Sequence, residues 1–205
     1  MQYKRFVTGS FQENAFILWD QDLQTVIIDP GDDAAIIINF IESNQLLPQA
    51  ILNTHAHVDH VQAVAPLQEQ YDLPFHLHAD DQNLIDHLPD YCRLFGIPIC
   101  SQPQVNQNLQ DNQNLVFGQL QIQVLGTPGH SLGGVCFLIE DHLFVGDTLF
   151  AGSIGRTDLP GGSYTQIIQS IKERILILPD GTKVHPGHGP DTTVGTERAQ
   201  NPFLQ

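Results

Sequence analysis

The first half of the chain alternates short apolar runs, rich in β-branched and aromatic residues, with polar turns. Such runs are typical of buried strands, whereas apolar residues at helical spacing behind acidic residues indicate a helix. We therefore predict strands at 5–9, 14–20, 25–30, 50–54 and 74–78, and helices at 32–47, 60–71 and 80–88.

The second half repeats this order of elements, with strand-like runs at 120–131, 134–140 and 142–150, a helix at 163–176 and a strand at 181–190. Each half contains a hairpin whose second arm ends in an aspartate, Asp29 or Asp147, and then a helix and a strand ending near a histidine. The repeat predicts two similar β-β-α-β halves packed face to face, with polar side chains from strand ends meeting at one edge. A chance likeness between short strands is the alternative.

A glutamine-rich segment at 101–124 separates the halves. It is either a low-complexity linker or a hydrated loop, and its isolated apolar positions favour the loop. No segment divides the chain, so we predict one domain over 1–205.

Composition narrows the class of protein. With 205 residues, 41% apolar and 15% charged, the chain is long enough to bury a sizeable core. A net charge of −15 with only eight Lys and Arg argues against a basic groove, so we expect no nucleic-acid partner. Three cysteines without C-x-x-C spacing, and no apolar stretch of signal-peptide or membrane-helix length, predict a cytoplasmic protein without a membrane partner.

The stretch "NTHAHVDH" concentrates metal-ligand chemistry in His55, His57, Asp59 and His60. In an extended segment, side chains two apart share a face, so His55 and His57 can bind one ion. Asp59 and His60 follow where a helix should begin and need not face the same point. Since zinc and similar ions take three or four such ligands, other segments must complete the site.

Three later segments offer further candidates: His130 in the turn "TPGHSLGG", Asp147 after an apolar strand in "VGDTLF", and His188 between glycines in "VHPGHGP". Alone, each would be interpreted as an exposed turn residue or a helix cap. The dense His and Asp motif makes them candidate ligands. No motif completes a site around the remaining histidines, which we interpret as surface, turn or supporting residues: His76, His78, His87, His142 and His185.

The motifs "THAHVDH", "GHSLGG", "GDTLF" and "GHGP", in this order and spacing, resemble those of the metallo-β-lactamase superfamily. The similarity is greatest to the glyoxalase II branch, the hydroxyacylglutathione hydrolases, and extends to "ERAQNPF" near the end. The resemblance implies an α/β (α+β) fold, the αββα four-layer sandwich, with the site at one edge. The C-terminal helical domain of longer members has no counterpart here.

The resemblance also implies a division of the ligands. His55, His57 and His130 would hold one ion, Asp59, His60 and His188 a second, and Asp147 would bridge them. Asp59 is in addition the candidate catalytic residue. We expect two divalent ions per chain, with zinc preferred over iron and manganese, because nitrogen and oxygen ligands suit these metals.

The implied activity is that of a metal-dependent hydrolase. A hydroxide bridging two ions would cleave an acyl-thioester such as S-lactoylglutathione to a carboxylic acid and glutathione. The alternatives are a mononuclear iron persulfide dioxygenase on the same fold, a metallohydrolase of another small ester or thioester, and a metal-binding module without catalysis. A β-lactamase without an export signal, or a nuclease of this charge, is not expected.

Two basic residues are candidates for substrate binding. Arg156, in "GSIGRTDLPGG", lies where glyoxalase II carries a basic residue that contacts glutathione, and Lys183 is a weaker candidate near His188. Asp158 and Pro190 replace aromatic contacts of longer members, which predicts weaker glutathione binding or a different thioester. The sequence makes no prediction about the oligomeric state.

Overall fold

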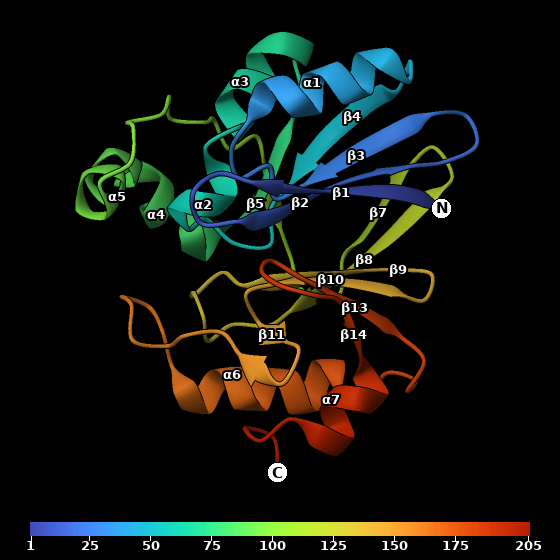
Figure 1. The fold of residues 1–205 in the computed structure, drawn as a ribbon, viewed down its shortest axis with the longest axis vertical. Helices are drawn as coiled ribbons and strands as arrows, with labels where there is room; N and C mark the ends of the chain where they lie inside the picture. The colour runs from blue at the N-terminus through green and yellow to red at the C-terminus, as the bar shows by residue number, and fades with distance from the viewer.

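The computed structural model describes residues 1–205 and consists of two facing six-stranded sheets with helices on both outer faces (Figure 1). The first sheet has the order β1-β2-β3-β4-β5-β6 and the second β14-β13-β10-β9-β8-β7. The first sheet contains β1 (Gln2–Thr8), β2 (Glu13–Trp19), β3 (Gln24–Ile28), β4 (Leu47–Leu52), β5 (Phe75–His78) and β6 (Gln107–Leu109). The second contains β7 (Asn114–Phe117), β8 (Leu120–Gly126), β9 (Val135–Ile139), β10 (His142–Gly146), β13 (Lys183–Pro186) and β14 (Thr192–Thr193).

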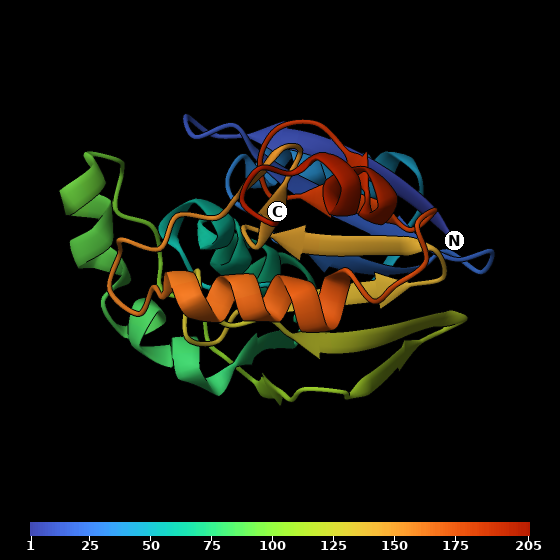
Figure 2. The same cartoon turned by 90° about the horizontal axis from the view of Figure 1, so that it is seen from below.

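The helices form the two outer layers and one end of the molecule. In Figure 1, α1 and α3 cover the first sheet, and α6 and α7 cover the second; Figure 2 shows α6 running across the outer face of its sheet. A small hairpin, β11 (Leu149–Phe150) and β12 (Ser153–Ile154), follows β10. The helices are α1 (Ala34–Ser43), α2 (Val58–Val61), α3 (Val64–Tyr71), α4 (Gln82–Asp86), α5 (Leu88–Phe95), α6 (Tyr164–Ser170) with a π-helical continuation at Ile171–Ile175, and α7 (Val194–Gln200), with a 3₁₀ turn at Ala79–Asp81. None of them is long and apolar enough to cross a membrane.

Alternation along the central strands produces three buried layers. Ile17 of β2 packs with α1 and α3 on the outer side, whereas Phe16 and Leu18 enter the layer between the sheets. On β10, Phe144 faces that middle layer and Leu143 packs beneath α6 and α7. Both faces of these strands are buried, which explains their continuous apolar runs. The predicted αββα sandwich is therefore confirmed.

The internal repeat is also present. β2 and β3 are antiparallel, and β3 is parallel to β4 across α1. β9, β10 and β13 repeat this arrangement across α6. The carboxyl ends of parallel neighbours lie at the same edge of a sheet, and the candidate ligands follow these ends.

Two predicted elements differ most from the structure. The expected helix at 60–71 is interrupted, because the N–H groups of Gln62 and Ala63 donate to the carbonyls of Gly31 and Pro30 instead of continuing one helix. The expected hydrated loop at 101–124 contains β6, β7 and the start of β8. Most of its isolated apolar residues are buried between the sheets, and most of its glutamines face solvent. A strand pair at the edge of a sheet therefore has the composition of a loop.

Candidate metal centre

The "THAHVDH" motif leaves β4 in an extended conformation before α2 begins at Val58. Asn53 stabilises this turn, because its side-chain amide donates to the carbonyls of His60, at 2.7 Å, and His55, at 3.3 Å. His57 is still extended, and the first turn of α2 then presents Asp59 and His60. The motif thus supplies ligands from both sides of a strand-to-helix junction.

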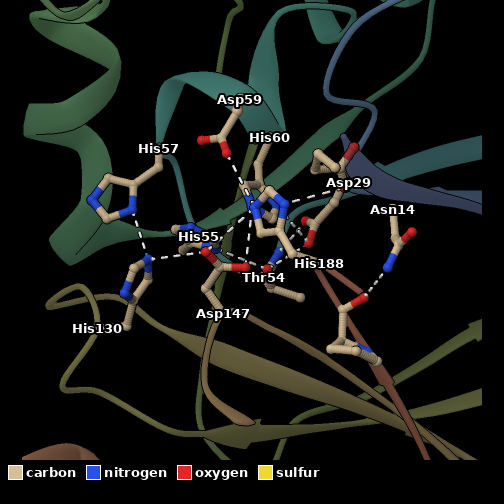
Figure 3. Close-up of polar contacts among 12 residues, drawn as sticks. Asn14, Asp29, Thr54, His55, His57, Asp59, His60, His130, Asp147 and His188 are labelled. Atoms are coloured by element: carbon tan, nitrogen blue, oxygen red, sulfur yellow. Dashed lines mark hydrogen bonds and ion pairs between the residues drawn. The ribbon is translucent and has the colours of Figure 1, made fainter. Parts of the chain in front are cut away.

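Two groups of three donor side chains form at this junction, each with its donor atoms within 4.8 Å of one another (Figure 3). His55, His57 and His130 form the first, in which Nδ1 of His57 lies 2.8 Å from Nε2 of His130. The second group consists of Asp59, His60 and His188. These are the two sets of three residues expected from the sequence.

Asp147 lies between the two groups. Its Oδ2 atom is 3.6 Å from Nε2 of His130 in the first group and 3.6 Å from Nε2 of His188 in the second. Its Oδ1 atom is 3.4 Å from Nε2 of His60. The structure therefore brings all seven candidate ligands together, with one carboxylate between the two groups.

The chemistry of these groups fits divalent cations. The side-chain atoms His55 Nε2, His60 Nε2 and Asp147 Oδ1 are buried without a hydrogen-bond partner, which is costly unless another group satisfies them. A methyl group on Gly187 would lie 2.4 Å from Oδ1 of Asp147, so glycine is needed for the chain to pass this close. Unpaired nitrogen and oxygen lone pairs in a tight pocket are what a bound cation would satisfy.

Protonation in the site agrees with this interpretation. Burial, reinforced by the neighbouring His130, lowers the pKa of His57 to about 3, and burial with nearby imidazoles holds the pKa of His55 well below its usual range. Burial also opposes charge on Asp147, but His60 and His130 outweigh it and lower the pKa of that carboxyl. Neutral imidazoles and an ionised carboxylate are the forms that bind metal.

His60 behaves differently from the first group. Burial lowers its pKa, yet the carboxylates of Asp147 and Asp59 outweigh burial and raise the pKa well above its ordinary value. Without a metal, these carboxylates draw a proton to the imidazole. A divalent cation would balance the same negative charge.

Asp29 and Thr54 support the ligands from behind. Asp29 accepts hydrogen bonds from the Thr54 hydroxyl and backbone N–H, and its Oδ2 lies 3.2 Å from Nδ1 of His60. Asp29, His55 and His60 form a third close group of potential ligands. We assign Asp29 a supporting role, because both of its oxygens are engaged and the unpartnered Nε2 atoms of the two histidines belong to the ligand groups.

Two further buried carboxylates were not identified from the sequence. Asp81 accepts from the N–H groups of Ala56 and Gly133 and from the Ser131 hydroxyl, so it ties the first histidine motif to the "GHSLGG" turn. Glu13 is 1% exposed, and its Oε1 lies 3.7 Å from Nδ1 of His60. Glu13 follows a polar turn and Asp81 lies at the start of a predicted helix, so neither stands out in the sequence, and only the fold brings them to the ligands.

A cavity of about 420 Å³ opens over the ligands. Arg156 lines it, but its guanidinium makes two 2.7 Å contacts with the carboxylate of Asp158. Lys183 is not among the lining residues. It begins β13, pairs with Asp141 at 3.1 Å, and is separated from the His188 loop by the length of that strand, about 10 Å. Its expected role in this cavity is therefore corrected.

The other histidines lie outside the ligand groups. His76 is buried on β5, His78 ends β5 and caps the 3₁₀ turn, and His87 is exposed. His142 and His185 stack on each other at 5.1 Å, and His185 is buried rather than on the surface.

Comparison with known proteins agrees with the fold and the motifs. The model of the metallo-beta-lactamase superfamily matches residues 8–188. The probable metallo-hydrolase YqgX of Bacillus subtilis is 40% identical, covering 100% of this chain and 98% of YqgX. The hydroxyacylglutathione hydrolase GloC of Haemophilus influenzae is 36% identical, covering 95% of this chain and 94% of GloC.

Solved structures extend the comparison. The BLEG-1 B3 metallo-beta-lactamase superposes with a TM-score of 0.94 at 41% identity, covering 100% of both chains. TTHA1623, solved in a di-iron-bound form, gives 0.90 at 43% identity, covering 98% of this chain and 100% of that one. ETHE1 from Myxococcus xanthus gives 0.84 at 25% identity, covering 98% of this chain and 84% of ETHE1.

Proposed function

This chain belongs to the metallo-β-lactamase superfamily, and we propose that within this family of metal-dependent hydrolases it cleaves acyl-thioesters to a carboxylic acid and a thiol. The observation that carries the proposal is the position of Asp147 between two complete groups of three donors. A bridging carboxylate of this kind is suited to two ions side by side. We expect zinc first, with iron as the principal alternative because TTHA1623 was solved with two iron ions.

Two bound divalent ions would supply a nucleophile from water at neutral pH and would polarise the scissile carbonyl. The protein's own side chains would hold these ions and accept a proton. The neutral imidazoles of the buried His55 and the half-buried His57 would hold one ion, and Asp59 and His188, whose side chains lie 3.2 Å apart, would hold the second. Asp59 lines the cavity, so it is placed to accept a proton from water beside the substrate.

A thioester suits this site because a thiolate leaves without prior protonation, and the cavity lining contains no cationic acid beyond the histidine ligands and Arg156. GloC, which is named a hydroxyacylglutathione hydrolase, matches this chain over 94% of its own length. GloC therefore carries this name although it has no long segment beyond the part that matches this chain. We propose a small-molecule thioester as the substrate, without a nucleic-acid or membrane partner.

A persulfide dioxygenase is the second candidate, because ETHE1 shares the fold at 25% identity. Such an enzyme would hold a single iron with two histidines and one aspartate. The complete second group, Asp59, His60 and His188, would not be needed to hold that single iron, so it favours the hydrolase, although some dioxygenases retain similar residues.

One experiment tests the proposal. Purified protein is analysed for metal and assayed for hydrolysis of S-lactoylglutathione and of simpler thioesters, with oxygen uptake on glutathione persulfide and β-lactam hydrolysis as parallel assays. We expect two ions per chain and thioester cleavage. Fewer than two ions without thioester cleavage would overturn the proposal, and oxygen uptake would favour the dioxygenase. The β-lactam assay is included because BLEG-1 carries that name.

A further inference from the structure

The cavity over the ligands has an aromatic side built from two segments far apart in sequence. Phe11 lies in the turn between β1 and β2, and Phe95 is the last residue of α5. Their rings lie 5.9 Å apart at an angle of 88°, an edge-to-face contact that closes one side of the opening. Tyr91, one turn earlier on α5, continues this aromatic side.

Two of these aromatic side chains are partly exposed to solvent. Phe11 and Phe95 are each 38% exposed, although both line the cavity. Phe150, Ile154 and Leu159 add apolar surface elsewhere in the lining. Apolar surface held open beside a reactive centre is typical of a ligand subsite, because a bound apolar group would remove it from water.

The charges of the cavity favour the same class of ligand. Apart from the candidate metal ligands, Arg156 is the one charged residue in the lining, and Asp158 already pairs with its guanidinium. The chain as a whole carries a net charge of −15, which disfavours the approach of an anionic substrate. Outside the candidate metal centre, glutathione, with two carboxylates, would therefore meet one cation, and that cation is already paired.

We propose that Phe11, Tyr91 and Phe95 form a subsite for an apolar, uncharged group next to the scissile bond. The inference rests on the proposed thioester hydrolysis and names its substrate class: thioesters with an aromatic or branched aliphatic substituent. The apolar group could belong to the acyl part or to the thiol, and the substrates below distinguish these two sources.

The test compares three thioesters with the metal-loaded enzyme. Acetyl N-acetylcysteamine is the small reference, phenylacetyl N-acetylcysteamine carries the apolar group on the acyl side, and S-benzyl thioacetate carries it on the thiol side. For each thioester, kcat/KM is divided by the rate of its hydrolysis by hydroxide in solution. The ratio of this corrected value for one apolar compound to that for the reference should be about ten or more. In Phe11→Ala and Phe95→Ala, this ratio should fall toward one.

Leu94→Ala is the matched control, because Leu94 lies on the same helix, is 73% exposed and does not line the cavity. It should keep the wild-type ratio. Equal kcat/KM for all three thioesters, or a ratio that the Phe95→Ala change leaves intact, would overturn the subsite while leaving thioester hydrolysis in place.

A binding measurement keeps the two proposals separable. The uncleavable thioether S-phenethyl N-acetylcysteamine is titrated calorimetrically into wild type, Phe95→Ala and Leu94→Ala. Binding to wild type and Leu94→Ala that is about tenfold tighter than binding to Phe95→Ala supports the subsite. This holds even if no thioester is cleaved, since absence of cleavage would refute only the proposed hydrolase activity. Indistinguishable binding to the three proteins rejects the subsite.

Discussion

Thr54 donates two hydrogen bonds to the carboxylate of Asp29, from its backbone N–H at 2.7 Å and from its hydroxyl at 2.6 Å. Because the hydroxyl proton is used in this way, the Thr54 oxygen accepts from Nδ1 of His55, 3.0 Å away. His55 then carries its proton on Nδ1, and the lone pair on Nε2 is directed to the first ligand group. One pair of residues at the ends of β3 and β4 therefore sets the tautomer of a candidate ligand.

Thr54→Val should weaken metal binding by roughly 10- to 100-fold, because it removes the hydroxyl that orients His55 while keeping the shape of the side chain. Competition with a chromogenic chelator measures the affinity. Thr54→Ser keeps the hydroxyl and is the control, so it should bind metal close to wild type. Equal affinity in the valine and serine variants would contradict the role assigned to this hydroxyl.

His57→Ala and Asp59→Ala should each reduce the metal content from two ions to about one per chain, because each removes one ligand from a different group. His57→Ala should also abolish thioester turnover while the circular dichroism spectrum remains that of wild type. Asp147→Ala should lower occupancy of both positions. Metal analysis after dialysis checks all three, and loss of both ions in His57→Ala would show that the groups are not independent.

Gly187→Ala should abolish metal binding and turnover, because its methyl group would meet Asp147 Oδ1 at 2.4 Å and His60 Cε1 at 2.7 Å. Gly181→Ala provides a matched control, since nothing lies within 4 Å of a methyl group there. Metal content and kcat/KM are compared for the two variants. A fully active Gly187→Ala enzyme would mean that the ligands tolerate a shift of this size.

Stability should fall in mild acid partly through His76. Burial lowers the pKa of this imidazole, so it is neutral in the folded protein, whereas the unfolded chain takes up a proton below about pH 6.5. The unfolded state then binds more protons, and the free energy of unfolding falls as the pH drops. Urea unfolding between about pH 7 and pH 5 should show a shallower fall in His76→Gln.

The control for this measurement is His87→Gln, since His87 follows α4 and is exposed, with its Nδ1 atom 2.9 Å from the carbonyl oxygen of Asn83. That variant should reproduce the wild-type pH profile. If His76→Gln also follows the wild-type profile, protonation of His76 does not contribute to the acid sensitivity.

The two similar halves could be predicted because the succession of strands and helices along the chain is set by local sequence patterns. The apolar runs that end at Asp29 and Asp147 specified β3 and β10, and both strands are buried on two faces. The edge strand β7 was missed, because one of its faces is solvated and the glutamines on either side of it, Gln113 and Gln119, resemble a loop. α7 was missed as well, since its short polar sequence gives a weak helical pattern.

The sequence by itself determined which side chains are candidate ligands, because five histidines and two aspartates lie in short motifs that follow strands and are directed to one edge. Their proximity, and the position of Asp147 between two groups, required the two sheets to pack face to face. Tertiary structure alone brought in the buried carboxylates of Glu13 and Asp81. It also separated Lys183 from the cavity and placed Phe11 against Phe95, since contacts between distant segments depend on packing and not on local pattern.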